Sequence, residues 1–291
     1  MQLGSVQITR IEDYHGPGLA PEFMFPAIDA KMWEDAPDWA RRFVDLSANR
    51  LLTSIHSWLV RTPHHTVLID SCIGNHKERP HVPHFNMRDA PWLQRLQAAG
   101  VQPEEVDFVM CTHLHADHVG WNTRLQDGRW VPTFPNAKYL FSQTEFDSWD
   151  ARRPDYVARP FNQCVFEDSI LPVVEAGQVQ FVEEGYGVDD VLSVESAPGH
   201  TAGSVKIRVS SQGSEGMFSG DVIHHPLQLH RPDLCSSFDE DQGTALQTRI
   251  RMLDDCAARG SLLMPTHFAA PFCCRITGHD HQGGYLPDWN V

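Results

Sequence analysis

The sequence predicts an α+β domain in which two β-sheets are covered by helices. Short runs rich in β-branched and aromatic residues alternate along the chain with longer amphipathic runs. No low-complexity segment or clear linker divides the 291 residues, so we expect one domain over 1–291. Hydrophobic residues make up 41% of the chain, which is enough to build a sizeable core.

The chain up to about residue 50 is expected to be an irregular arm. It contains prolines with large aromatic residues between them: Pro17, Pro21, Pro26, Pro37, Phe23, Phe25, Trp33 and Trp39. Proline removes a backbone donor and interrupts regular structure. This arm could cover a pocket, contact a second copy of the chain in a homodimer, or pack into the core.

Strand and helix patterns alternate through the middle of the chain. Pro63-His64-His65 provides a turn between two strands, Gly100 ends a helix, and Asp127-Gly128 signals another turn. The expected strands are 51–60, 66–70, 106–112 and 137–141, and the expected helices are 90–100 and 143–152.

The same alternation continues to the end of the chain. One long helix has Leu246, Ile250 and Leu253 on one face and is followed by Gly260. The expected strands are 179–183, 191–196, 204–210, 216–219 and, as the final one, 261–264, with the helix over 244–258. The His- and Asp-containing segment 278–284 is expected to be a solvated turn, because it has no partner spacing elsewhere.

Charge, hydropathy and cysteine content exclude several classes of protein. The net charge of −15 argues against a nucleic-acid partner. The chain contains no run of about 18 apolar residues, so no membrane-spanning helix is expected. The first ten residues lack the regions of a secretory signal peptide, so we expect a cytoplasmic location. The seven cysteines are odd in number and contain no Cys-x-x-Cys pair, which favours free thiols.

The strongest signal of function is the run His113-Leu114-His115-Ala116-Asp117-His118 after strand 106–112. In an extended chain His113 and His115 point to the same side, and Asp117 and His118 then fall on the following turn. Imidazole and carboxylate suit zinc above all, or iron, manganese, cobalt or nickel, better than calcium or magnesium. The alternative interpretation is a solvated histidine-rich loop.

Three more candidate ligands each follow a predicted buried strand. His200 lies on the Pro198-Gly199 turn, Asp221 ends Met217-Phe218-Ser219-Gly220, and His267 ends 262–266. Strand ends are where open α/β sheets build their sites. An isolated histidine after a strand is more often an ordinary loop residue. These three residues are therefore credible ligands only in combination with the run His113–His118.

This ordered set resembles the metallo-β-lactamase superfamily over about residues 50–270. The resemblance implies a four-layer αββα sandwich and two divalent metal ions. It implies that one metal is bound by His113, His115 and His200, that a second is bound by Asp117, His118 and His267, and that Asp221 bridges them. Asp70 would correspond to the buried acid that orients a ligand.

The resemblance also implies a dinuclear hydrolase in which a hydroxide between the metals attacks a lactone or carboxylic ester. Asp117 or Asp221 would take up the proton and return it to the leaving group. Neither Gly-x-Ser-x-Gly nor a Walker-type loop is present, which disfavours two other hydrolase classes. Lactonases that open acyl-homoserine lactones usually carry a Tyr three residues after the bridging Asp, whereas this chain has His224.

We therefore expect a hydrolase of small-molecule lactones or esters, with His224 as a further catalytic candidate. An organophosphate triesterase of the same fold, a non-hydrolytic iron-dependent dioxygenase and a metal-binding member remain alternatives. No nucleic-acid or membrane partner is expected. The residues next to the candidate ligands either line the cleft or pack in the core; these are Trp121, Asn122, Phe268 and Phe272.

Overall fold

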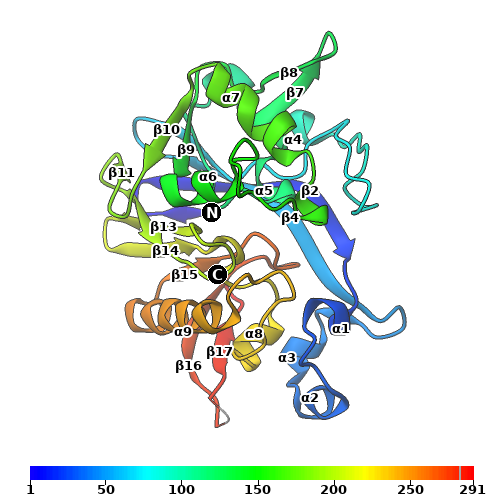
Figure 1. Cartoon of the computed structure of the whole chain (residues 1–291). Coiled ribbons are helices and arrows are strands. Elements are labelled where there is room, and N and C mark those ends of the chain that lie inside the picture. Colours follow the sequence, from blue (N-terminus) through cyan, green and yellow to red (C-terminus); the bar gives the residue numbers. More distant parts are fainter. Residues whose placement is uncertain (282) are drawn as a thin grey trace.

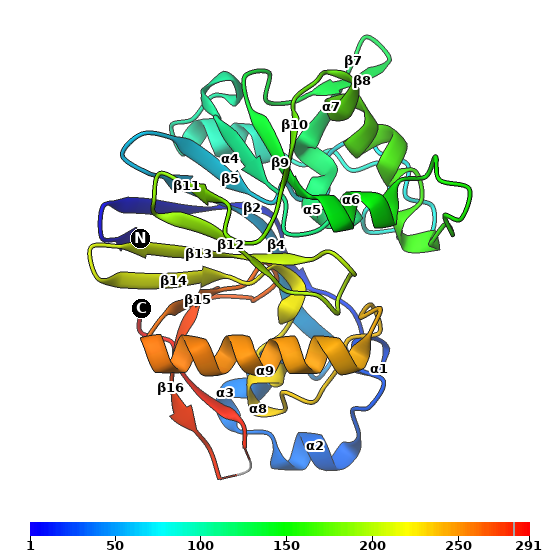
Figure 2. The ribbon, with the colours of Figure 1, turned by 60° about the vertical axis from the view of Figure 1, so that its left-hand side comes forward.

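The computed structural model describes residues 1–281 and 283–291 and contains two β-sheets that face each other, with helices on the outer faces (Figures 1 and 2). The first sheet has the order β1-β2-β4-β5-β6-β9-β10, with β3 paired to β4. Its strands are β1 (Gln2–Leu3), β2 (Val6–Pro17), β3 (Val44–Asp45), β4 (Arg50–Arg61), β5 (Thr66–Ile69), β6 (Phe108–Met110), β9 (Lys138–Ser142) and β10 (Val179–Val182).

The second sheet is formed by the C-terminal part of the chain in strict sequence order from β11 to β17. Its strands are β11 (Gly187–Val188), β12 (Leu192–Ser196), β13 (Val205–Ser211), β14 (Ser214–Phe218), β15 (Leu262–Met264), β16 (Cys274–His279) and β17 (Tyr285–Asp288). A separate hairpin of β7 (Thr123–Gln126) and β8 (Arg129–Pro132) turns at Asp127-Gly128, as predicted.

The helices form the two outer layers and a small N-terminal group. They are α1 (Pro21–Met24), α2 (Ala30–Asp35), α3 (Asp38–Arg41), α4 (Trp92–Ala98), α5 (Ala116–Val119), α6 (Gln143–Trp149), α7 (Leu171–Glu175), α8 (Leu227–His230) and α9 (Gln242–Arg259). Helix α9 begins where Asp241 accepts a hydrogen bond from the backbone N–H of Thr244, and it ends at left-handed Gly260. The four-layer α+β sandwich predicted above is confirmed.

Three apolar clusters separate the layers. The middle one lies between the sheets and includes Trp58 and Val67 of the first sheet with Ile207 and Met264 of the second. A second cluster packs α4 and α6 against the first sheet, and a third packs α9 against β14, β15 and β16. Central strands such as β4 and β5 therefore contact two apolar layers, which explains their short hydrophobic runs.

Two expectations about the ends of the chain are wrong. The segment 1–50 is not irregular throughout, because the 12-residue strand β2 pairs with β4 from Gln7 to Pro17 inside the first sheet. Strand 261–264 is not the last one, because β16 and β17 extend the second sheet beyond it. The segment 278–284 lies at the connection between these two strands, and its Gln282 is outside the described residues.

The remaining part of the predicted arm contains α1, α2 and α3, which project from the sandwich in Figure 1. Phe25 and Val44 of this part pack with Leu227 and Leu234 next to α8. All seven cysteines are free. Within residues 1–281 and 283–291, no helix has both the length and the apolar composition needed to cross a membrane.

Candidate metal centre

The candidate ligands come together at one edge of the two facing sheets. Strands β5 and β6 run parallel in one sheet, and β14 and β15 run parallel in the other, so their carboxyl ends meet at this edge. His113 follows β6 and His115 is the residue before the first turn of α5. Asp221 follows β14 and His267 follows β15, which brings ligand types from both sheets to one point.

The carboxylate of Asp221 lies in the centre of the cluster. Its Oδ1 lies 3.1 Å from Nε2 of His267 and 3.3 Å from Nε2 of His118. Its Oδ2 lies 3.4 Å from Nε2 of His200 and 3.8 Å from Nε2 of His113. The two oxygens therefore face two different groups of side chains. This is the arrangement expected of a residue that bridges two cations.

Four of the imidazoles have their outer nitrogen fixed by a second residue. Asp70 Oδ2 lies 2.8 Å from Nδ1 of His118, and Asp239 Oδ1 lies 3.0 Å from Nδ1 of His200. Nδ1 of His267 lies 3.0 Å from the carbonyl oxygen of Ser54, and Thr112 Oγ1 lies 3.2 Å from Nδ1 of His113. Holding Nδ1 in this way orients Nε2 toward the centre and fixes the tautomer.

Two groups of side chains can each hold one divalent ion. The ligand atoms of His113, His115 and His200 lie within 4.8 Å of one another, and so do those of Asp117, His118 and His267. Within the described part of the chain, Nε2 of His113 and of His118 and Oδ1 of Asp221 are buried without a hydrogen-bond partner. Unpaired buried polar atoms are costly, so the donor set fits two cations.

The titration behaviour of the cluster has clear physical causes. Burial lowers the pKa of His113 and of His115 well below the usual value, which keeps both rings neutral. Burial also opposes the charged form of His118, but Asp221 and Asp70 outweigh it and raise the pKa of His118 well above its usual value. Burial opposes the charged form of Asp221 as well, yet His267 and His118 lower the pKa of this carboxyl.

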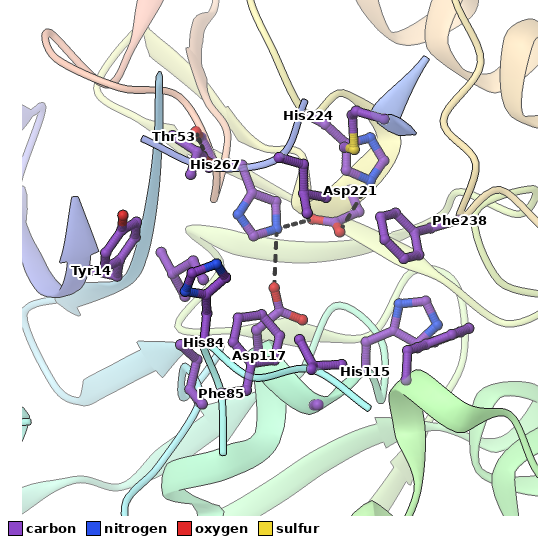
Figure 3. A pocket seen from close by; sticks show the side chains of 18 of the residues that line it. Tyr14, Thr53, His84, Phe85, His115, Asp117, Asp221, His224, Phe238 and His267 are labelled. Carbon is purple, nitrogen blue, oxygen red and sulfur yellow. Dashed lines mark hydrogen bonds and ion pairs between the residues drawn. The ribbon is translucent and has the colours of Figure 1, made fainter. Parts of the chain in front are cut away.

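The cluster forms the floor of a pocket with a volume of about 180 Å³ (Figure 3). In Figure 3 Tyr14 and Thr53 line one side and Phe238 and His115 the other, with His84 and Phe85 between Tyr14 and Asp117. Most of the wall is apolar and comes from segments far apart in sequence: Leu19, Met24, Leu51, Ile55, Ile73, Val82, Phe85, Phe161 and Phe238.

The pocket wall formed by the loop between β5 and α4 is firmly anchored. Arg79 donates two hydrogen bonds to Asp168, of 2.6 and 2.8 Å, and Lys77 Nζ lies 3.4 Å from the same carboxylate. Burial lowers the pKa of Lys77 to about 7, and Asp168 opposes this change. Arg88 in turn donates a 2.8 Å hydrogen bond to Asp13. Val82 and Phe85 are therefore held in place against the pocket.

His224 lies inside the cluster rather than on a surface loop. Its Nε2 lies 3.2 Å from Oδ2 of Asp221, and its ring stacks parallel to that of His267 at 6.0 Å. Burial lowers the pKa of His224. The position lines the pocket, so a substrate above Asp221 would contact this ring.

The four residues for which the sequence left cleft lining and core packing open do not line the pocket: Trp121, Asn122 and Phe268 are buried, and Phe272 is partly buried. Trp121 stacks on Trp92 with ring centroids 5.4 Å apart, and Asn122 accepts a hydrogen bond from Ser71. Phe268 is fully buried with C-terminal residues, and the Phe272 ring lies beneath the guanidinium of Arg10. Proximity in sequence to a ligand did not place these side chains in the pocket.

The aromatic residues that do face the pocket come from elsewhere. Phe161 lies 5.0 Å from the His115 ring and 5.7 Å from the Phe238 ring. Sequence analysis also missed Asp239 and Glu145, which contact the ligand loops. A Ser236-x-x-Asp239 spacing is typical of any local turn, so no sequence signal distinguished Asp239 as a partner of His200.

Comparison with known proteins agrees with this geometry. The family model of the metallo-beta-lactamase superfamily matches residues 51–259. Metallo-beta-lactamase domain-containing protein 1 of Xenopus laevis is 36% identical over 124 residues, which are 41% of this chain and 40% of that protein. N-acyl homoserine lactonase AttM of Rhizobium johnstonii is 28% identical over 134 residues, 44% of this chain and 45% of that protein.

The matched segments thus span less than half of these two curated relatives. The likeness in three dimensions extends over the whole chain. The crystal structure of hydrolase AbOPH, in the beta lactamase superfamily, is 25% identical with a TM-score of 0.81, and the match covers 99% of this chain and 95% of that one. The fold, the ligand cluster and the family model agree, and the chain belongs to the metallo-β-lactamase superfamily.

Proposed function

We propose that this chain is a dinuclear metal-dependent hydrolase of small-molecule lactones or carboxylic esters that carry an apolar substituent. The observation that carries the proposal is the central carboxylate of Asp221, with one oxygen toward each of two ligand groups. The lactonase AttM among the relatives supports lactones as the first substrates to test.

His113, His115 and His200 would hold one divalent ion, and Asp117, His118 and His267 a second, with zinc the first to test. Such ions would supply a water of lowered pKa and would polarise the carbonyl oxygen of the substrate. In the reaction, water oxygen bonds to the carbonyl carbon, and the bond from that carbon to the leaving oxygen breaks. One water proton must then reach the leaving alkoxide. Asp117 is suited to carry it, because its side chain is 17% exposed and lines the pocket, whereas the side chain of Asp221 is only 6% exposed.

The pocket wall supports an apolar substituent on the substrate. Phe161, Phe238 and Leu19 offer no hydrogen bond to a charged group, and burying an apolar chain against them is favourable by about 0.8 kcal/mol per methylene. His224 is placed to donate a hydrogen bond from Nε2 to a substrate oxygen when it is not engaged with Asp221.

The proposal is tested with a hydrolysis panel on zinc-loaded protein that contains lactones, aryl esters, thioesters and phosphotriesters. We expect about two metals per chain and hydrolysis of lactones or esters that is abolished by chelation and restored by metal. Full activity after complete metal removal would contradict the proposal. Preference for phosphotriesters would support the organophosphate triesterase alternative, and stoichiometric iron with oxygen uptake would support the dioxygenase alternative.

A further inference from the structure

Glu145 departs from the role that its sequence position predicts. The spacing Ser142-x-x-Glu145 at the start of α6 is that of a capping box, in which the glutamate would turn back to the backbone of the serine. Ser142 does accept a hydrogen bond from the backbone N–H of Glu145. Glu145 is only 1% exposed, and its carboxylate binds other donors instead of the backbone of Ser142.

Four donors surround this buried carboxylate. Oε1 accepts hydrogen bonds from the backbone N–H of Leu114 at 2.9 Å and from Trp149 Nε1 at 2.8 Å. Oε2 accepts from Thr201 Oγ1 at 2.7 Å and from the backbone N–H of Gly203 at 3.1 Å. Burial raises the pKa of Glu145, and the hydrogen bonds oppose this by favouring the ionised form.

The two oxygens hold two different ligand loops. Leu114 lies between His113 and His115, and Thr201 directly follows His200. These three histidines make up one of the two groups of candidate ligands. The Glu145 carboxylate is thus a direct bridge between the loop that carries two of the ligands and the loop that carries the third.

Two further contacts tighten this bridge. The Trp149 ring, whose Nε1 is held by Glu145, packs edge-on against the His115 ring with centroids 5.2 Å apart. A side chain at Gly203 would place its Cβ 2.1 Å from the backbone nitrogen of Glu145. Glycine at 203 therefore permits the close approach of the His200 loop to α6.

We propose that Glu145 is a positioning residue that sets the distance between the His113–His115 loop and His200, and thereby the affinity of the metal position that these histidines form. The inference rests on the proposed dinuclear centre. Glu145 does not line the pocket, so it acts through the two loops and not on substrate. In Glu145→Gln an NH₂ group replaces one carboxylate oxygen, so the backbone N–H of either Leu114 or Gly203 loses its acceptor and the loop that carries it is loosened.

The test is a metal titration of chelator-treated protein with Co²⁺, followed by absorption, and with Zn²⁺ against a competing dye. Glu145→Gln should weaken one of the two binding events by about 10- to 100-fold and leave the other near wild type. His200→Ala, which removes a ligand of that position alone, identifies the affected event. Thr201→Val should weaken the same event less, and Thr201→Ser should restore it.

Asp168→Asn is the matched control, because Asp168 is also a buried carboxylate with several donors but holds Lys77 and Arg79 instead of a ligand loop. It should lower thermal stability and leave both binding events unchanged. Unchanged binding in Glu145→Gln, or equal weakening of both events in Glu145→Gln and Asp168→Asn, would overturn the inference. If Glu145→Gln does not fold, the inference is tested by the two Thr201 variants alone. Equal metal affinity in Thr201→Val and Thr201→Ser would then overturn it.

Failure of the proposed function is distinguishable from failure of this inference. Wild-type protein that binds two metals yet hydrolyses nothing in the panel contradicts the proposed hydrolase, while the titration still decides the role of Glu145. Wild-type protein that binds no metal overturns both.

Discussion

Nε2 of His200 lies 3.0 Å from Nδ1 of His115, although the two residues are 85 positions apart in the chain. Burial lowers the pKa of His115 well below its usual value, so the ring is neutral and at least one of its nitrogens is an acceptor. His113 completes the group from the same loop. Three buried imidazoles whose nitrogens converge in this way are suited to share a cation.

We therefore predict that His115→Ala and Asp221→Asn each lose at least one metal per chain. The loss of kcat/KM should exceed the about 10- to 100-fold typical of removing an outer partner of a ligand, because a ligand atom itself is removed. Metal content by elemental analysis and steady-state kinetics check this. His279→Ala is the control, since its side chain is 52% exposed and contacts Tyr285. Wild-type rates in either ligand variant would refute the assignment.

His224→Phe is predicted to change substrate preference more than metal content. The phenyl ring keeps the stacking against His267 but loses the nitrogen that lies 3.2 Å from Asp221. Substrates whose oxygen accepts a hydrogen bond from this nitrogen should lose about tenfold or more in kcat/KM, and others less. The ratio of rates on paired lactone and aryl-ester substrates measures the effect. Equal loss on every substrate together with loss of metal would contradict this role.

Phe238→Ala is predicted to weaken selection for apolar substituents. Phe238 lines the pocket and contacts Phe161, so the truncation removes apolar surface from the wall. KM for esters with long alkyl chains should rise about tenfold, and KM for acetyl esters should change little. Phe181→Ala is the matched control, because Phe181 is 42% exposed and does not line the pocket. A similar KM increase for both ester lengths would argue against the predicted binding mode.

Glu195→Gln is predicted to lower thermal stability at neutral pH but not in acid. Burial opposes the charged form of Glu195, but hydrogen bonds from Arg208 and Lys206 outweigh it and lower the pKa below the usual 4.5. In this case the unfolded state binds more protons, so the stabilisation is complete above pH 4.5 and is lost as pH falls through the folded-state pKa. The side chain is 23% exposed, so we expect roughly 1 kcal/mol or less.

The measurement for Glu195 is the difference in Tm between wild type and variant from pH 7 down to pH 3. This difference should shrink below about pH 4.5. Glu184→Gln, at an exposed position, provides the comparison. A difference in Tm that stays constant over the whole range would show that the ion pairs do not cause it.

Local patterns in the sequence determined much of the fold. Helix α9 could be predicted to within two residues because its apolar face and the glycine that ends it, Gly260, both act within a few residues. The His113–His118 run was visible for the same reason, since its four ligand-type residues lie within six positions. Strand β2 was missed because Pro17 and the residues after it suggested an irregular arm, whereas long-range pairing with β4 makes residues 6–17 a strand.

By itself, the sequence determined the order of most strands between about residues 50 and 264 and the residue types available to bind metal. Only the tertiary structure decided which side chains face the pocket and which hold the ligand loops. Phe238 faces the pocket while Phe268 is in the core, and Glu145 contacts two loops instead of capping its own helix. The physical reason is that periodicity and turn chemistry act over a few residues, whereas these contacts join segments that meet only when the two sheets pack.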